Sequence, residues 1–161
     1  MPPVISVVGK SGAGKTTLIE KLIPEIKKRG YRVGVIKHAH HGYSLDMKGK
    51  DSWRHREAGA DAVMVAAPGT IAMVKDTPSD SLYVLQAYFQ DLDLVITEGY
   101  KKEDKPKIEV IRKSRSSKSI CGNSDHLIAV VTDTEVEEID VPRFGFDDVG
   151  PLAELIIKTF L

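Results

Sequence analysis

The residues best suited to chemistry lie near the N-terminus, directly after a short apolar stretch. Gly9 to Thr16 reads GKSGAGKT, which fits the pattern G-x-x-x-x-G-K-[ST]. In such a loop the backbone N–H groups point at phosphate oxygens, the lysine reaches the β- and γ-phosphates, and the hydroxyl ligates Mg²⁺. We predict that this loop binds a nucleoside triphosphate, with Lys15 also catalytic and Thr16 a metal ligand. The predicted binding residues are Gly12, Ala13, Gly14, Lys15, Thr16 and Thr17.

A magnesium-bound triphosphate also needs a carboxylate near the metal. Glu98 ends the apolar stretch LVITE, so its carboxylate should emerge at the sheet edge where ligands of open α/β folds bind. Asp46 follows another predicted strand, in a loop that can approach the metal or the attacking water. A solvated loop aspartate is the alternative interpretation of Asp46. We predict Asp46 and Glu98 as catalytic and metal-side residues.

The sequence contains no N-K-x-D or T-K-x-D motif for guanine recognition. The comparable residue is Asp133, which follows the apolar stretch LIAVVT and can accept hydrogen bonds from a guanine edge. An aspartate that begins a turn is an equally simple interpretation. Asp133 is therefore a candidate base-binding residue, and the motifs alone do not separate GTP from ATP.

Three histidines lie close together in the stretch KHAHHGYSLD, from Lys37 to Asp46. On an extended chain His38 and His40 share a face while His41 points away, which leaves a zinc site short of ligands. We favour a position beside the triphosphate, where an imidazole donates to phosphate or to another bound ligand. Polar loop residues satisfied by the backbone are the plainer alternative.

The elements that must position these residues follow from the periodicity of the chain. Short β-branched stretches alternate with segments of helical period, which is typical of a parallel sheet covered by helices. We predict an α/β fold: a three-layer P-loop NTPase fold with a mostly parallel sheet, helices on both faces and a β-hairpin extension, in a single domain spanning 1–161. Strands are expected within 4–9, 31–38, 61–67, 70–76, 91–99, 106–114 and 126–133, and helices within 18–26, 49–60, 80–89 and 148–160.

Composition narrows the classes of partner. The 161 residues contain 23 basic and 23 acidic side chains, so the chain has no net charge that would attract nucleic acid or an anionic membrane. The single cysteine, Cys121, fits a reducing compartment, and no apolar stretch is long enough to span a bilayer. The N-terminus lacks the pattern of a signal peptide. We expect a cytoplasmic protein.

One stretch is strongly biased in charge. Between Lys101 and Lys118 lie eight basic residues and three acids, a net charge of 8 − 3 = +5. This stretch is suited to an anion or a partner protein, or it is a solvated hairpin. Its segment KIEVIR reads as an alternating edge strand that is able to pair with its copy in a dimer. Arg54 and Arg56 lie on the short helix expected within 49–60. They either bind an anion or form a solvated charged face.

Three stretches together resemble one family, that of molybdopterin-guanine dinucleotide biosynthesis protein B, MobB. They are VVGKSGAGKTTLIEKLI, VGVIKHAHHGYSLDMKGKDSWRHREAGAD and DLVITEGYKKEDKPKIEVIR. The resemblance implies a GTP-binding, usually dimeric protein with weak hydrolysis. It also implies that such a protein assists a MobA-type nucleotidyltransferase in attaching GMP to molybdopterin. Whether molybdopterin itself binds is left open.

Two other functions use the same phosphate loop. A small-molecule kinase would need an acceptor site and an arginine-bearing lid, for which RKSRSSK is a candidate. A dimerisation switch of the MinD kind would use Lys10 to reach the nucleotide of a partner subunit, although such proteins usually carry a glycine where this chain has Ser11.

Overall fold

The computed structural model describes residues 1–39, 42, 46–122, 124, 126–136 and 139–161. The chain divides into two units, each described by itself below. The first unit comprises residues 1–38 and 85–161, and the second comprises residues 39–84. Whether the two units act as the single predicted domain stays a prediction. Within the described part of the chain, none of the helices combines the length and apolar character that a bilayer crossing requires.

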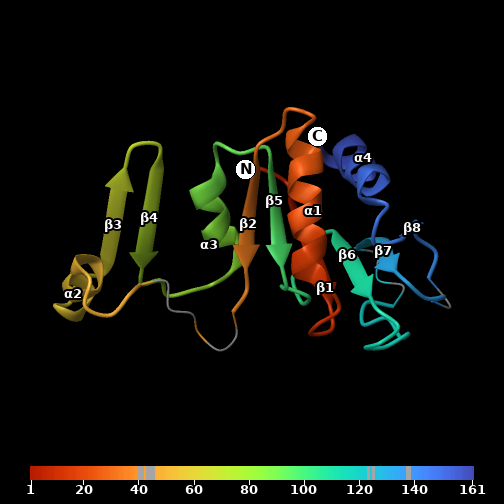
Figure 1. Cartoon of the computed structure of the whole chain (residues 1–161), viewed down its shortest axis with the longest axis horizontal. Coiled ribbons are helices and arrows are strands. Elements are labelled where there is room, and N and C mark those ends of the chain that lie inside the picture. The colour runs from red at the N-terminus through yellow and green to blue at the C-terminus, as the bar shows by residue number, and fades with distance from the viewer. Residues whose placement is uncertain (40–41, 43–45, 123, 125, 137–138) are drawn as a thin grey trace. The chain divides into compact units, whose positions relative to one another are not determined.

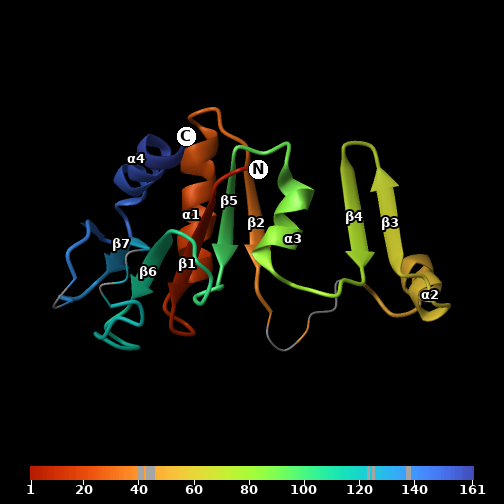
Figure 2. The same ribbon diagram turned by 180° about the vertical axis from the view of Figure 1, so that it is seen from behind.

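The apolar, β-branched stretches of the first unit form one six-stranded sheet in which every pair is parallel. The strand order is β2-β5-β1-β6-β7-β8 (Figures 1 and 2). All carboxyl ends therefore meet at one edge, where ligands of open α/β sheets bind. The bounds are β1 Val4–Gly9, β2 Val33–Lys37, β5 Leu94–Glu98, β6 Lys107–Ile111, β7 Leu127–Thr132 and β8 Arg143–Phe144.

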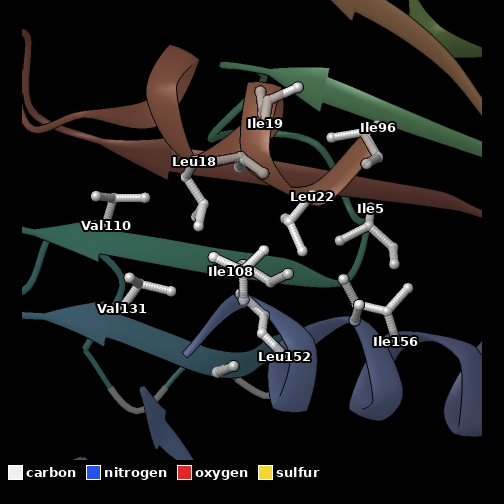
Figure 3. Close-up of a cluster of buried hydrophobic side chains, with 14 of the residues drawn as sticks. Ile5, Leu18, Ile19, Leu22, Ile96, Ile108, Val110, Val131, Leu152 and Ile156 are labelled. Carbon is white, nitrogen blue, oxygen red and sulfur yellow. The ribbon is translucent and has the colours of Figure 1, made fainter. Parts of the chain in front are cut away.

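Helices α1 (Lys15–Lys27) and α4 (Val149–Phe160) cover one face of this sheet. Their apolar residues, among them Leu22 and Leu152, pack with Ile5 of β1 into one buried cluster (Figure 3). The 3₁₀ helix η1 (Gln86–Phe89) lies at the opposite face beside β2, since a Cβ added to Gly34 would come within 2.5 Å of Phe89. The predicted α/β fold is confirmed, with the phosphate loop held between the first strand and a well-packed helix.

One predicted position in the sheet is wrong. The segment KIEVIR was expected at an exposed edge, but β6 lies between β1 and β7 and all five of its residues are buried. Its polar residues give the pattern of an alternating edge strand, but they are buried and hydrogen-bonded. Lys107 donates to the carbonyl oxygens of Glu103 and Lys105, and Glu109 accepts hydrogen bonds from the segment that follows. With both edges paired, β6 cannot pair with a second copy of itself.

The second unit contains α2 (Asp51–Glu57) and an antiparallel hairpin of β3 (Ala62–Ala67) and β4 (Thr70–Lys75). The hairpin turns at Pro68 and Gly69, as the sequence predicts. The helix expected within 80–89 is formed by α3 (Leu82–Leu85) followed directly by η1. Most residues of the hairpin are exposed, so this unit buries little apolar surface of its own.

Candidate functional site

The phosphate loop connects β1 to α1 and approaches β6 closely. A Cβ at Gly9 would collide with the carbonyl oxygen of Val110, so only glycine fits there. Gly14 precedes the first helical residue with φ 102°, in the left-handed region that glycine adopts at low cost. The predicted strand–loop–helix context is therefore present, and it supports the nucleotide-binding interpretation of the motif.

Lys15 lies across this loop. Its ammonium donates to the carbonyl oxygens of Gly9 and Lys10, both at 3.0 Å. Burial lowers the pKa of Lys15, and the nearby carboxylate of Glu98 opposes that effect. The ammonium therefore stands at the concave side of the loop, where phosphate oxygens would be received.

The structure brings two predicted metal-side residues together from positions far apart in the sequence. The Thr16 hydroxyl lies 3.0 Å from each carboxylate oxygen of Glu98, to which it donates. This contact arises because β1 pairs with β5, with Val7 opposite Glu98. A hydroxyl and a carboxylate oxygen are the hard ligands that Mg²⁺ prefers, and Lys37, 3.7 Å from the carboxylate, keeps that group surrounded by positive charge.

Asp46 belongs to the second unit. It accepts a hydrogen bond of 2.8 Å from the Ser52 hydroxyl of α2. It also borders a cavity of about 250 Å³ whose lining includes Trp53, Arg56 and Asp76. Because the structure describes the two units separately, the catalytic and metal roles of Asp46 stay predictions.

Of the three clustered histidines, only His38 is among the described residues. Its ring stacks on Tyr100, with ring centroids 4.4 Å apart and planes at 21°. Tyr100 has φ 55°, an uncommon backbone conformation for a residue with a side chain, two residues after Glu98. His40 and His41 lie outside the described residues, so both interpretations of this cluster, contact with a bound ligand and polar loop residues, stay predictions.

Asp133, the candidate base-binding residue, follows β7 and is exposed. Its Oδ1 accepts a hydrogen bond of 2.7 Å from the backbone N–H of Lys113. Asp133 thus fixes the chain that leaves β6, as a turn-forming aspartate would. Its contact with a base stays a prediction.

The predicted binding residues do not include two arginines that lie against the phosphate loop. Arg112 donates from Nε to the Ala13 carbonyl oxygen at 3.2 Å, and its guanidinium lies 4.1 Å above the Phe146 ring. A Cβ added to Gly12 would lie 2.9 Å from Nη2 of Arg115. The basic bias of residues 101–118 was the available signal, but the wrong edge position of β6 hid its relation to the loop.

Known proteins resemble this chain over most of its length. The model of the family described as Molybdopterin guanine dinucleotide synthesis protein B, MobB, matches residues 4–133. The molybdopterin-guanine dinucleotide biosynthesis adapter protein of Haemophilus influenzae is 40% identical over 157 residues, covering 96% of this chain and 87% of that protein. The Escherichia coli adapter protein is 37% identical over 166 aligned residues, with 98% and 93% covered.

Comparison of the fold with solved structures also identifies MobB proteins as similar. The crystal structure of Bacillus subtilis MobB superposes with a TM-score of 0.77 at 27% identity, covering 99% of this chain and 98% of that one. The range matched by the family model, residues 4–133, contains the phosphate loop, Glu98 and Asp133. These matches confirm the resemblance found in the sequence motifs, and the chain belongs to the MobB family of molybdopterin guanine dinucleotide synthesis proteins.

Proposed function

We propose that the chain is a GTP- and Mg²⁺-binding adapter in the synthesis of the molybdopterin guanine dinucleotide cofactor. The observation that carries nucleotide binding is the contact of Thr16 with Glu98 beside the glycine-rich loop. A loop of backbone donors, a lysine and two oxygen ligands for a divalent cation are the parts that P-loop NTPases share. GTP rather than ATP is supported by the family to which the chain belongs.

The chemistry expected here is binding with slow hydrolysis. The loop amides from Gly12 to Thr16 would hold the phosphates, and Lys15 would exchange its two carbonyl partners for β- and γ-oxygens. Mg²⁺ held by Thr16 and Glu98 would neutralise charge on those oxygens. Glu98 or Asp46 would orient a water for in-line attack, and no other general base is required for a slow reaction.

Nucleotide titration tests this proposal. Wild-type protein should bind GTP more tightly than ATP in the presence of Mg²⁺, measured by calorimetry. Lys15→Ala should weaken GTP binding by about 100-fold, since a charge-assisted contact to two phosphates is lost. Lys10→Ala is the matched control, because Lys10 is an exposed lysine of the same loop. Equal affinity of the wild type for GTP and ATP would contradict the guanine preference.

We further propose that a MobA-type nucleotidyltransferase is the partner, which agrees with the word adapter in the names of the curated relatives. Formation of the guanine dinucleotide by that enzyme should rise when this chain is added with GTP. The rise should be lost with Lys15→Ala. Pull-down of labelled molybdopterin by this chain alone decides whether it binds the pterin directly. An equal rate with and without the chain would rule out the adapter role.

Labelled GTP separates this proposal from a kinase. An adapter with slow hydrolysis releases only inorganic phosphate, whereas a kinase transfers the γ-phosphoryl group to an acceptor. Lys10→Ala tests a dimerisation switch of the MinD kind, for which hydrolysis at high protein concentration would fall. Unchanged hydrolysis would leave Lys10 as an exposed loop residue.

We propose that the protein is a homodimer, and that the β3–β4 hairpin takes part in the contact. Met64, Val65 and Ile71 are 54%, 52% and 65% exposed. The strand register places Val65 on one face and Met64 with Ile71 on the other. A two-stranded hairpin with apolar residues on both faces is marginal alone in water, so a second copy that covers it would stabilise it.

A further inference from the structure

The two flanks of the phosphate loop meet different strands of the sheet. On one flank, Thr16 binds Glu98 at the end of β5. On the other flank, the Ala13 carbonyl accepts a hydrogen bond from Arg112 just beyond β6, and β1 separates β5 from β6. A cation held by Thr16 and Glu98 would neutralise charge on the terminal phosphates of a bound nucleoside triphosphate. The γ-phosphate would therefore lie toward β5, and the α-phosphate and nucleoside toward β6.

The segment that leaves β6 on this flank, residues 112–121, is anchored along its length; we call it the arginine loop. At its start, Arg112 is held by the Ala13 carbonyl and the Phe146 ring. Next, the Lys113 N–H is fixed by Asp133. At its end, the buried carboxylate of Glu109 accepts hydrogen bonds from the Ser119 hydroxyl and the N–H groups of Ile120 and Cys121. The loop therefore presents its side chains from a fixed backbone.

Arg115 lies between these anchors. Its backbone N–H donates to the Arg112 carbonyl at 2.8 Å, and its guanidinium lies against Gly12 of the phosphate loop. Arg115 is exposed. Within the part of the chain that the structure describes, no carboxylate forms an ion pair with its guanidinium. A planar guanidinium without an acid partner among these described residues is suited to bind phosphate oxygens.

The space around the arginine loop argues against a separate anion site. The hollow bordered by Lys10, Ala13, Glu109 and the arginine loop measures about 10 Å³. Such a volume holds one water molecule and excludes a phosphate group. The carboxylate of Glu109 is already taken up by the end of the loop. This hollow therefore holds no anion beside Arg115, and the neighbouring group that the structure does show is Gly12 of the phosphate loop.

We propose that Arg115 contacts the α-phosphate of the bound nucleotide, and that Arg112 is the positioning residue that fixes the arginine loop against the phosphate loop. This inference rests on the proposed nucleotide binding, and it adds a recognition element on the nucleoside side of the site. Arg115 thus acts on every phosphorylated form of the nucleotide, whereas Glu98 acts on forms that carry the cation.

Calorimetric titration with GDP and GTP tests the assignment. Arg115→Ala should weaken both nucleotides by the same factor, about tenfold, because the α-phosphate is common to them. Arg115→Lys should recover part of the loss, since it keeps the charge but not the planar fork. The matched control is Lys113→Ala, which removes one positive charge from the same loop and should stay within about twofold of wild type.

The outcomes separate the two proposals. Wild-type protein that binds neither nucleotide refutes the proposed function and this inference with it. Wild-type binding with unchanged affinity in Arg115→Ala refutes the inference alone, as does a loss confined to GTP, which would place the contact at the γ-phosphate. Equal losses in Arg115→Ala and Lys113→Ala would show a general charge effect and would also overturn it. A melting temperature like that of the wild type shows that a variant folds. If Arg115→Ala does not fold, the affinities of Arg115→Lys are compared with those of the wild type instead.

Discussion

At the scale of residues, the site depends on a few oxygen and nitrogen atoms held at short range. The Thr16 hydroxyl and the Glu98 carboxylate meet although 82 positions separate them in the chain. Lys15 and Lys37 supply positive charge near Glu98. Such an arrangement favours a ligand that brings its own anionic oxygens and a cation together, as a magnesium-bound triphosphate does.

Glu98→Gln should remove the dependence of GTP binding on Mg²⁺. The amide cannot neutralise a divalent cation, so affinity in Mg²⁺ should fall about tenfold toward the value measured in a chelator. Asp93→Asn is the matched control, since Asp93 lies before the same strand and accepts a hydrogen bond from the Arg32 N–H. A Glu98→Gln protein with an undiminished magnesium effect would exclude Glu98 from the metal site.

The phosphate loop and Glu98 were predictable because each depends on local spacing next to an apolar strand. Arg112 and Phe146 were not, because their contact depends on the position of β6 beside β1 and of the segment before α4. Lys107 and Glu109 misled the prediction of β6, since a pattern of alternating polarity does not show that a polar side chain is buried with hydrogen-bond partners. The roles of Asp46 and Asp133 remain predictions, because the sequence around each residue does not determine how far its carboxylate lies from the nucleotide.

At the scale of elements, Glu109 connects strand β6 to the arginine loop. It is buried in the sheet and accepts hydrogen bonds from one side chain and two backbone N–H groups of the loop. Glu109→Gln should destabilise the fold by about 1–3 kcal/mol, because a neutral amide replaces a charged acceptor of several bonds. Urea unfolding measures that loss, and faster hydrogen exchange at Ile120 and Cys121 locates it. Unaltered exchange at these two amides would show that the loop is held by other contacts.

The same carboxylate controls the chemistry of Cys121. Burial, with the charge and hydrogen bond of Glu109, raises the pKa of the Cys121 thiol from 9.0 to about 12. The native thiol should therefore react slowly with iodoacetamide, and its rate should increase little between about pH 8 and 10. The urea-unfolded chain, in which the pKa is ordinary, is the control and should react steadily faster over that range.

This shift also makes folding depend on pH. The folded state retains the thiol proton over the interval from 9.0 to about 12, where the unfolded chain has lost it. The contribution of Cys121 to stability is thus complete below pH 9.0 and decreases as the pH rises through that interval. Cys121→Ala should remove this part of the alkaline loss in unfolding experiments. An identical pH dependence in the variant would mean that another group is responsible.

At the scale of the whole molecule, the two units differ in how much core they contain. The first unit buries a continuous apolar cluster between its sheet and two helices (Figure 3). In the second unit, neither α2 nor the hairpin strands contains a buried residue. The second unit therefore gains little stability from burial of its own apolar side chains.

Met64→Lys with Ile71→Glu should convert the proposed dimer to monomers. Both substitutions place charge on one apolar face of the hairpin, where desolvation on association would be unfavourable. Size-exclusion chromatography with light scattering measures the mass. Tyr83→Ser, at an exposed aromatic of the same unit outside the hairpin, is the control and should leave the mass unchanged. A dimer that persists in the double variant would place the interface elsewhere.

Gly9, at the start of the glycine-rich loop, lies close to the Val110 carbonyl of β6, which couples the position of the loop to that of the strand. A ligand that shifts the loop at Gly9 would also shift the backbone of β6, and with it the Arg112 guanidinium 4.1 Å above the Phe146 ring. The side-chain Nε–H resonance of Arg112 would therefore serve as a spectroscopic reporter of loop occupancy. The chemical shift of this one group would then report whether the phosphate loop is occupied, without direct contact between Arg112 and the ligand.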